Sequence, residues 1–444
     1  MSDNSAIAPK IRDRDRQAIL RALRAGVVPR TGLQHIQVGR KQEIQAVMRD
    51  LEQVGDGGAA VRFVIGRFGA GKSFFLNLVS TVALEKGFLV TRADITTDRR
   101  LHGNSGQARA LYAELMRNLA SKSKPEGGAL ASVVERWLSD VIGSPGEAVD
   151  IEKQVGSQLR DLRELVSGFD IAQVLAQYLR GYQANDEAKQ QAALKWLRGE
   201  YATKTEARED LGVRSIIDDE DIYDYLKLMA KFARVMGYKG LVICVDELVV
   251  FSHRLASRRA RASNYEAILR IVNDCLQGSV EGLHFLFGGT DECLEDRRRG
   301  IYSYEALATR LAPNEFAKGE AVDLSGPVLR LRTLAQEDLY VLLHRIRDVF
   351  ALGDSQKHLI SDEGLLAFVE HSRRTLGAEY FKTPRDTVIR FVGLLSMLEQ
   401  DSTTKWQDVL QVVGQQQVPV SDSAEADSTV SPDTDADDLV SFKL

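Results

Sequence analysis

The sequence of 444 residues lacks the features that define several classes of protein. No apolar run approaches the roughly 20 residues of a membrane span, and the opening MSDNSAIAPK has no apolar stretch of the kind found in signal peptides. Three cysteines, Cys244, Cys275 and Cys293, lie far apart without a CxxC or CxxH pair. The sequence therefore predicts neither a disulfide framework nor a zinc site, and we expect a cytoplasmic protein with no membrane partner.

Motifs of several enzyme classes are also missing. Seven histidines are scattered without an HExxH or HxH pair, and there is no GxSxG motif or Cys–His nucleophile pattern. The formal net charge is −5, yet residues 421–444 contain seven acids and one lysine, which leaves the rest of the chain near +1. Net charge therefore neither predicts nor excludes binding to nucleic acid.

The chain does contain the patterns of an ordinary α/β protein, with 44% hydrophobic and 27% charged residues. Apolar spacing predicts amphipathic helices over 10–28 and 37–54. Short β-branched runs at 61–66 and 88–95 predict strands on either side of a helix over 73–86. A strand, a helix and a strand within about 35 residues form a βαβ unit, whose right-handed crossover makes the two strands parallel.

The remaining patterns divide the chain into four parts. Strands are predicted over 241–247 and 283–290 with a helix over 264–277 between them, and only helices are expected from about 325 to 400. The parts are an N-terminal helical leader (1–32), an α/β core (33–325) with a helical insertion at about 107–237, a helical lid (326–415) and a disordered acidic tail (416–444).

Residues 66–73 carry the strongest chemical signal, because they read GRFGAGKS, a full GxxxxGK[ST] motif between a predicted strand and a predicted helix. Such a loop turns backbone N–H groups toward phosphate, and the start of the helix adds its positive end. Lys72 is expected to neutralise the β and γ phosphates of ATP, and Ser73 to ligate Mg²⁺. A plain glycine-rich turn is the disfavoured alternative. The expected nucleotide contacts are Gly66, Arg67, Phe68, Gly69, Ala70, Gly71, Lys72, Ser73 and Phe74.

A second signal is LVICVDE at 241–247, an apolar strand that ends in two carboxylates. Ligands bind at the carboxyl ends of parallel strands, so these acids are expected to meet the same nucleotide. Asp246 is assigned to the second shell of the metal ion and Glu247 to the general base that polarises the attacking water. The alternative is a solvated strand end without a catalytic role.

Thr290 and several arginines complete the candidate set. Thr290 ends the strand over 283–290, where it either contacts the γ phosphate and orients water or only forms a turn. Transfer of a phosphoryl group needs a positive side chain near the γ phosphate, often from a neighbouring subunit. Three places qualify: Arg297, Arg298 and Arg299, for which a solvated face is the alternative; Arg310; and Arg385, which opens a predicted helix after Pro384. We expect at least one of Arg297, Arg298, Arg299 or Arg310 to act from a neighbouring subunit.

A further arginine run lies at 253–263, HRLASRRARAS, with four arginines and no acid. DNA, a nucleotide bound to a neighbour, or water alone can occupy such a surface. No aromatic residues alternate with these arginines, so stacking of single-stranded bases is not indicated.

The order of these motifs resembles that of AAA+ ATPases near the origin-recognition and STAND groups. VGRKQEI at 38–44 resembles the segment that lies against adenine there, which implies contacts from Val38, Gly39 and Arg40. GRFGAGKS resembles Walker A, LVICVDE resembles Walker B, FGGTDE resembles sensor 1, LATRL resembles an arginine-finger region with Arg310, and FKTPRDTV resembles sensor 2 with Arg385. The fold implied is an AAA+ type P-loop NTPase with a parallel sheet, a helical insertion before Walker B and a C-terminal helical lid.

The chain also resembles the P-loop ATP-binding proteins encoded in BREX-type bacterial phage-resistance loci, through GRFGAGKSFFL and the helical insert before Walker B. This resemblance implies an ATPase that works with other defence subunits near DNA. Only about 30 residues separate the last lid helix from the acidic tail, so the winged-helix domain of origin-binding relatives is not expected.

Three functions follow from these observations. The first is a slow, Mg²⁺-dependent ATPase that acts as a motor or switch, with its site at the interface of a nucleotide-dependent homo-oligomer. The second is a scaffold that binds ATP without hydrolysing it and thereby fixes the docking face of a partner. The third is a loader or transposition-type regulator that places another enzyme on DNA.

Overall fold

The computed structural model describes residues 11–142, 168–316, 323–375, 383–401 and 403–415. Within these residues lies one parallel sheet of five strands, in the order β2-β3-β4-β1-β5. The strands are β1 (Ala59–Ile65), β2 (Leu89–Asp94), β3 (Leu241–Asp246), β4 (Leu283–Gly289) and β5 (Val328–Arg330). The parallel α/β architecture expected from the sequence is confirmed, with each predicted strand within two residues of its observed limits.

The fifth strand corrects the sequence prediction, which expected only helices after residue 325. β5 pairs in parallel with β1, from Phe63 opposite Val328 to Ile65 opposite Arg330. Three residues are too few to show the alternation of apolar and polar side chains by which strands are recognised. The prediction of helices alone over 326–400 is therefore wrong at this point.

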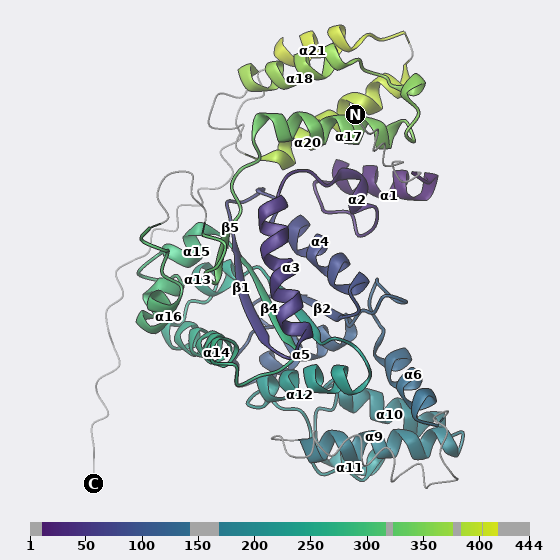
Figure 1. Cartoon of the computed structure of the whole chain (residues 1–444), viewed down its shortest axis with the longest axis vertical. Coiled ribbons are helices and arrows are strands. Elements are labelled where there is room, and N and C mark those ends of the chain that lie inside the picture. The colour runs from purple at the N-terminus through teal and green to yellow at the C-terminus, as the bar shows by residue number, and fades with distance from the viewer. Residues whose placement is uncertain (1–10, 143–167, 317–322, 376–382, 402, 416–444) are drawn as a thin grey trace, which may run out of the picture.

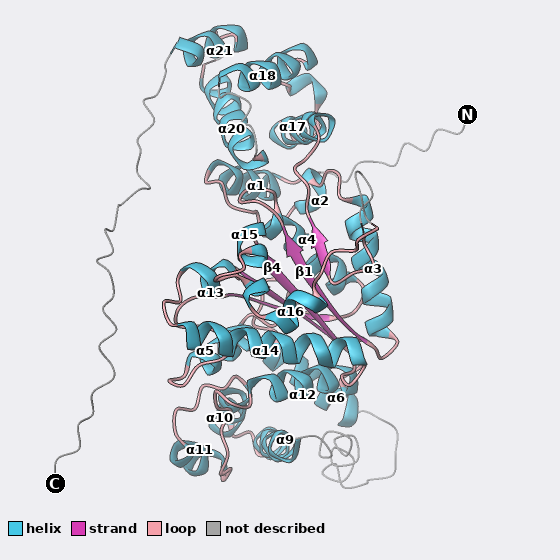
Figure 2. Cartoon of the chain, turned by 90° about the vertical axis from the view of Figure 1, so that its left-hand side faces the viewer, coloured by secondary structure: helices cyan, strands magenta, loops and turns pink. Residues whose placement is uncertain are grey.

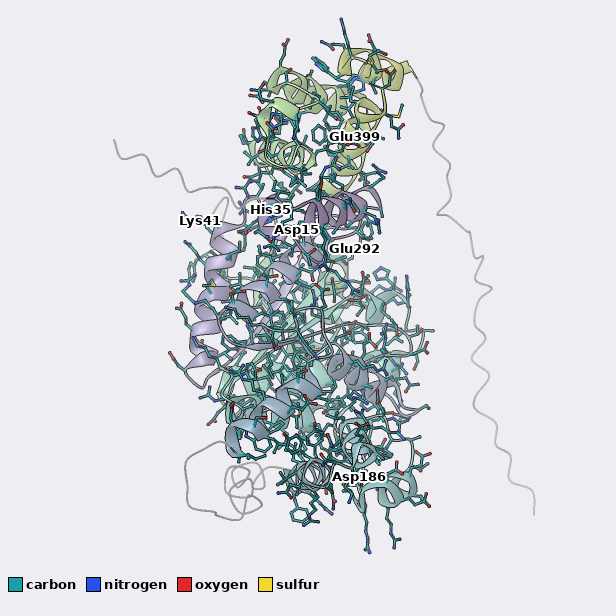
Figure 3. All side chains as sticks on the ribbon, turned by 90° about the vertical axis from the view of Figure 1, so that its right-hand side faces the viewer. Asp15, His35, Lys41, Asp186, Glu292 and Glu399 are labelled. Atoms are coloured by element: carbon teal, nitrogen blue, oxygen red, sulfur yellow. The ribbon has the colours of Figure 1, made fainter. Side chains whose placement is uncertain are left out.

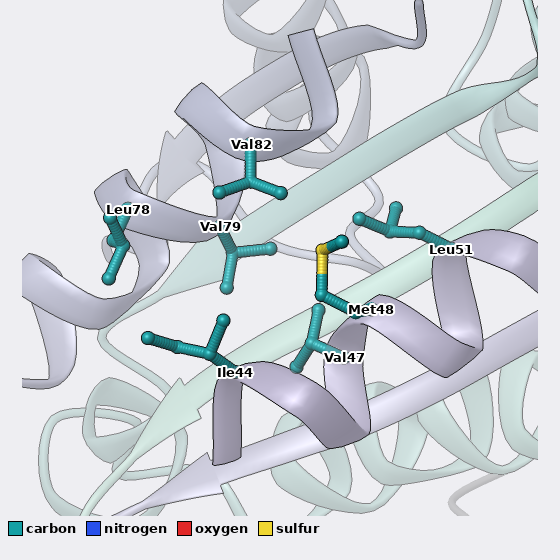
Figure 4. Close-up of a pocket in the computed structure, with 7 residues that line it drawn as sticks. All are labelled: Ile44, Val47, Met48, Leu51, Leu78, Val79 and Val82. Atoms are coloured by element: carbon teal, nitrogen blue, oxygen red, sulfur yellow. The ribbon is translucent and has the colours of Figure 1, made fainter. Parts of the chain in front are cut away.

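Alternate residues of the strands face two different layers of helices. Val64, Val90 and Leu286 belong to one apolar cluster with α3 (Lys41–Gly55) and α4 (Lys72–Glu85). Phe63 and Phe287 stack 5.1 Å apart on the opposite face, toward α5 (Gln107–Arg117), α12 (Ile222–Val235) and α14 (Arg258–Gln277). This period of two is that of a pleated strand, so both faces of the sheet are buried. Figure 4 shows the apolar seam between α3 and α4, with Met48 pointing toward Val79.

The described part of the insertion between β2 and β3 consists of helices joined by loops. Its elements besides α5 and α12 are α6 (Leu130–Ile142), α9 (Gly168–Gln183), α10 (Glu187–Leu197) and α11 (Lys204–Leu211). Aromatic pairs join these helices edge to face, with ring centroids 5.4 Å apart for Trp137 and Phe232 and 5.8 Å apart for Trp196 and Tyr225. The insertion lies at the end of the molecule opposite the C-terminal helices (Figure 1).

The C-terminal helices form a second apolar cluster, which also includes the N-terminal helix. Its helices are α17 (Gln336–Phe350), α18 (Asp362–Thr375), α20 (Pro384–Gln400) and α21 (Trp406–Gln415). Ile19 and Leu20 of α1 (Asp13–Arg24) are buried in this cluster, and Arg16 donates a 2.7 Å hydrogen bond to the Phe350 carbonyl. In Figure 3 the labels of Glu399 and Asp186 mark the two opposite ends of the molecule.

Short helices occupy the connections between these parts. They are α2 (Leu33–Ile36), α13 (Val249–His253), α15 (Asp291–Glu295), α16 (Glu305–Arg310) and the 3₁₀ turns η1 (Ile301–Ser303) and η2 (Ser355–Lys357). In the described part of the chain, no helix has both the length and the apolar composition needed to cross a bilayer. The predicted acidic tail at 416–444 lies outside the described residues.

Candidate functional site

The GRFGAGKS segment forms a loop, here called the nucleotide loop (66–73), at the carboxyl end of β1. The amide of Gly66 donates to the Gly289 carbonyl at 3.2 Å, which fixes the start of the loop against β4. Gly69 has φ +77°, and a Cβ atom on it would lie 2.7 Å from Cβ of Thr383, next to the start of α20. Position 69 requires glycine for two reasons, the left-handed backbone conformation and the close approach of the lid.

The side chain of Lys72 turns back toward the start of the nucleotide loop. Its Nζ donates hydrogen bonds to the carbonyls of Gly66 at 2.9 Å and Arg67 at 3.0 Å. Burial lowers the pKa of Lys72, while the carboxylates of Asp246 and Glu247 act in the opposite direction. An ammonium group in this position faces the space that the loop encloses, where phosphate oxygens can replace the carbonyls.

Ser73 and Asp246 join the two predicted motifs directly. The Ser73 hydroxyl donates to Oδ2 of Asp246 at 2.8 Å, although the two residues are 173 positions apart in the sequence. The other oxygen, Oδ1, accepts the backbone N–H of Glu247 at 2.8 Å. Both carboxylate oxygens are therefore held in place, and Asp246 faces the first turn of α4.

Gly288 on β4 makes room for this carboxylate, and the sequence analysis gave it no role. A Cβ atom on Gly288 would overlap Oδ1 of Asp246. The signal was present in the sequence as the glycine pair of FGGT, because glycine inside a strand often marks a close approach of another group.

Glu247 follows Asp246 in a left-handed backbone conformation, with φ +65°. For a residue with a side chain such a conformation costs about 1 kcal/mol or more, and it is common at active sites. Its carbonyl accepts the Val250 amide at 3.0 Å, so the strained residue leads straight into α13. Burial raises the pKa of Glu247, and the neighbouring Asp246 and Asp94 raise it further.

Asp94 is the second residue that the sequence analysis missed. It ends β2 directly opposite Asp246, and the Ile95 amide donates to the Asp246 carbonyl at 3.0 Å. Burial raises the pKa of Asp94, and the charge of Asp246 adds to this shift. Asp94 is the next-to-last residue of the predicted strand at 88–95, and an acid near the end of a parallel strand was the available signal.

Thr290 lies at this edge as expected, but its hydroxyl has a local partner. Oγ1 accepts the Cys293 amide at 3.2 Å and thereby caps α15. Arg330 of β5 holds the same short helix through ion pairs to Asp291 at 2.9 Å and Glu295 at 2.6 Å. The role of Thr290 toward the γ phosphate stays a prediction.

The segment 38–40 also reaches the nucleotide loop. Arg40, in a left-handed conformation with φ +60°, donates to the Ala70 carbonyl at 3.2 Å and to the Arg332 carbonyl. Gly39 lies against Asp338 in the first turn of α17, and Val38 is half-buried beside it. These contacts place the segment between the loop and the lid, and its contact with adenine remains a prediction.

The start of α20 meets the other side of the loop. The guanidinium carbon of Arg385 lies 5.6 Å from the centre of the Phe68 ring, and Phe68 is 71% exposed. The half-buried Phe74 packs against the apolar cluster of the lid instead of facing the loop. The lid therefore contacts the nucleotide loop through Arg385 and Phe68, and it contacts the start of α4 through Phe74.

Arg310 is the predicted site residue that the structure does not bring to the loop. It donates to Oδ1 of Asn273 near the end of α14 and to the Ala306 carbonyl at 2.9 Å in its own helix. Arg297, Arg298 and Arg299 follow α15 and are exposed.

Comparison with known proteins identifies the family. A search of curated proteins found no match to the chain. A family model described as BREX system ATP-binding protein BrxC/D matches residues 11–413, which include the nucleotide loop, both acids at the end of β3 and the lid. The chain therefore belongs to the family of BREX system ATP-binding proteins BrxC/D.

Proposed function

We propose that this protein is a Mg²⁺-dependent ATPase of the AAA+ kind that acts as a motor or switch in a phage-defence assembly, in association with DNA. The hydrogen bond between Ser73 and Asp246 carries this proposal, because it sets the helix after the nucleotide loop against the acids that end β3. A triphosphate in the loop would then lie between Lys72 and Glu247, where phosphoryl transfer to water requires a cation and a base.

The oxygen atoms of Ser73 and Asp246 fit a magnesium site. Mg²⁺ prefers oxygen ligands and is usually held by one or two protein groups together with substrate phosphates and water. When bound, the ion neutralises charge on the phosphates. Ser73 is proposed as a direct ligand and Asp246 as the carboxylate that orients it, and Gly288 keeps this carboxylate in place.

Glu247 is the proposed general base. Its backbone strain and its position after Asp246 aim it at the edge where β1, β3 and β4 end. A carboxylate with a raised pKa accepts a proton from water more readily than an ordinary glutamate. Asp94 is a positioning residue, since its negative charge raises the pKa of Glu247 without belonging to either motif.

The domain division into leader, core, insertion and lid is kept with two changes. Because β5 pairs with β1, we extend the core from residue 325 to Arg330. Because α1 is buried against α17 and α20, we assign the leader helix to the lid. Arg385 is proposed to move from Phe68 to the nucleotide when the lid closes. Arg310 is proposed to serve the nucleotide of a neighbouring subunit in a homo-oligomer, because in its own chain its guanidinium is hydrogen-bonded to Asn273 and to the Ala306 carbonyl and not to the nucleotide loop.

Steady-state phosphate release from ATP tests the proposal. Lys72→Ala is expected to abolish nucleotide binding, and Glu247→Gln to keep binding but to reduce turnover by at least about 100-fold. Glu209→Gln, at an exposed position of α11, is the matched control and should behave as wild type. Absence of phosphate release from the wild-type protein, with and without DNA, would instead support the non-hydrolysing scaffold.

A further inference from the structure

Six exposed arginines gather beside the nucleotide site. Arg254 follows α13, Arg258 and Arg259 begin α14, and Arg297, Arg298 and Arg299 follow α15. Within the described part of the chain, none of the six guanidinium groups has an ion pair or a hydrogen bond. We call these six residues the arginine surface.

The three segments that carry these arginines lie side by side. The hydroxyl of the buried Tyr265 on α14 donates to the Arg299 carbonyl at 2.6 Å, which joins α14 to the segment after α15. His253, at the end of α13, has its Nε2 3.9 Å from Oε2 of Glu292 on α15. Figure 1 and Figure 2 both show α13 and α15 next to each other, on the side of the molecule that faces the viewer in Figure 2.

The acids near the arginine surface already have other partners. Asp291 and Glu295 pair with Arg330 of β5. Oδ1 of Asp296 accepts the backbone amides of Arg298 at 2.7 Å and Arg299 at 3.2 Å. Asp296, the exposed Glu292 and Glu247 also carry negative charge near this surface, but the six arginines outnumber these three acids, so the surface is positive on balance.

Two of these arginines also stand where a cation is unfavourable for the fold. Arg258 and Arg259 occupy the first turn of α14, which contains no acid. A cation near the positive end of a helix costs about 0.3–1 kcal/mol. Folding therefore gains nothing from their charge, which points to a ligand outside the chain.

We propose that the arginine surface binds the backbone phosphates of a nucleic acid duplex. Guanidinium groups bind phosphate oxygens through paired hydrogen bonds, and cations spread over three segments suit phosphates that repeat along a strand. A single nucleotide held by a neighbouring subunit needs one arginine finger, far fewer than six. Residues 254–263 and 296–300 contain no phenylalanine, tyrosine, tryptophan or histidine on which bases would stack, so we expect a contact with the backbone that is independent of sequence.

The surface is also close to the proposed base. The five-residue helix α13 lies between Glu247 and Arg254. A duplex on the arginine surface would thus lie one short helix away from the group that activates water. This inference places the proposed association with DNA at the arginine surface. It rests on that association and not on ATP hydrolysis.

Binding is tested by fluorescence anisotropy with a labelled 30-base-pair DNA duplex, and with an RNA duplex of the same sequence, in the absence of nucleotide. Two triple variants carry the substitutions Arg254→Gln, Arg258→Gln and Arg259→Gln, or Arg297→Gln, Arg298→Gln and Arg299→Gln. Each lost phosphate contact reduces the slope of log affinity against log salt by about 0.9 in magnitude, so each triple variant should reduce it by about 2.7. Affinity in 50 mM salt should fall by about tenfold or more.

A control variant removes the same charge elsewhere, with Arg136→Gln, Arg208→Gln and Arg214→Gln at exposed positions of the insertion. It should retain both affinity and salt slope, and unchanged thermal unfolding of all three variants shows that they fold. Equal binding by all three variants and the wild type would overturn the inference. A second result would also overturn it: the variant with Arg297, Arg298 and Arg299 replaced binds the duplex normally and loses only ATP turnover. That result would assign these three arginines to a nucleotide bound by a neighbouring subunit. Lys72→Ala should bind the duplex normally, so failure of hydrolysis and failure of this surface are separate results.

Discussion

The guanidinium of Arg385 lies over the ring of Phe68, so the first turn of the lid helix α20 is supported by the tip of the nucleotide loop. A cation over an exposed aromatic ring is worth about 0.5–1 kcal/mol. Phe68→Leu keeps the apolar bulk but removes this attraction. We expect amide hydrogen exchange at residues 385–390 to become about two- to fivefold faster, as measured by mass spectrometry.

The control for this change is Phe169→Leu, at an exposed phenylalanine of the insertion. It should leave exchange in α20 as it is. If Phe68→Leu also leaves exchange at 385–390 unaltered, the contact between Arg385 and Phe68 does not hold the lid.

Gly288→Ala tests whether the Asp246 carboxylate needs the space that the missing side chain of Gly288 leaves. The added methyl group would overlap Oδ1 of Asp246 and push the carboxylate away from Ser73. A displacement near 1 Å at a catalytic group costs on the order of 100-fold in rate, so we expect a loss of this size in ATP turnover with a smaller effect on ATP affinity.

Gly393→Ala in α20 is the matched control, because a Cβ atom there has no neighbour within 4 Å. Alanine in place of glycine inside a helix should stabilise the protein by up to about 1 kcal/mol without changing turnover. Equal turnover in the Gly288→Ala and Gly393→Ala proteins would show that Asp246 needs no such space.

A buried ion pair between Asp50 and Arg62 fixes α3 to β1. Its distances are 2.6 Å from Nε to Oδ2 and 2.8 Å from Nη2 to Oδ1, and Arg62 also donates to the carbonyls of Leu324 and Gly326. Arg62→Met would leave the buried Asp50 carboxylate without its guanidinium, with only the ring of His284 3.8 Å away, and this should lower the free energy of unfolding by about 3–5 kcal/mol in urea titrations.

The double variant that combines Arg62→Met with Asp50→Leu should recover much of this loss, since no buried charge is then left alone. A double variant as unstable as Arg62→Met alone would mean that the guanidinium matters mainly through the carbonyls before β5.

His284 predicts a dependence of stability on pH. It is fully buried beside Asp50 and Arg62 with no hydrogen-bond partner for either ring nitrogen, and burial lowers its pKa to about 4. The unfolded chain binds this proton near pH 6.5, so the neutral ring stabilises the fold above that pH. The contribution falls by up to about 1.4 kcal/mol per pH unit as the pH drops from 6.5 toward 4.

Urea titrations of the wild type and of His284→Gln at pH 7 and pH 5 measure this effect. The wild type should lose more stability than the variant between the two values. Identical losses would mean that His284 is protonated in the folded protein or that its titration is balanced by Asp50.

The sequence predicted the parallel strands and the nucleotide loop because both rest on local patterns. Residues 61–65 are apolar and mostly β-branched or aromatic apart from Arg62, and the glycines with Lys72 and Ser73 form a motif of fixed spacing. Asp246 and Glu247 were predicted for the same reason, since the end of a parallel strand is a known place for ligands.

The residues that were missed depend on contacts across the fold. Gly288 matters only because β4 lies next to β3, and Asp94 only because β2 pairs with β3 in a register that sets it opposite Asp246. β5 was missed because three residues show no period, and its place is fixed by pairing with β1. Likewise, no pattern in the first 30 residues indicated that α1 is buried against α20.

The packing of α1 on α20 has a mechanical consequence. The helical body that contains α1, α17 and α20 is connected to the sheet by two stretches of chain, residues 25–40 and 331–335. The Arg40 side chain donates a hydrogen bond to the Arg332 carbonyl, so these two stretches of chain contact each other beside the nucleotide loop. A body held at two nearby anchors would turn about an axis through them, and this axis lies beside the nucleotide loop.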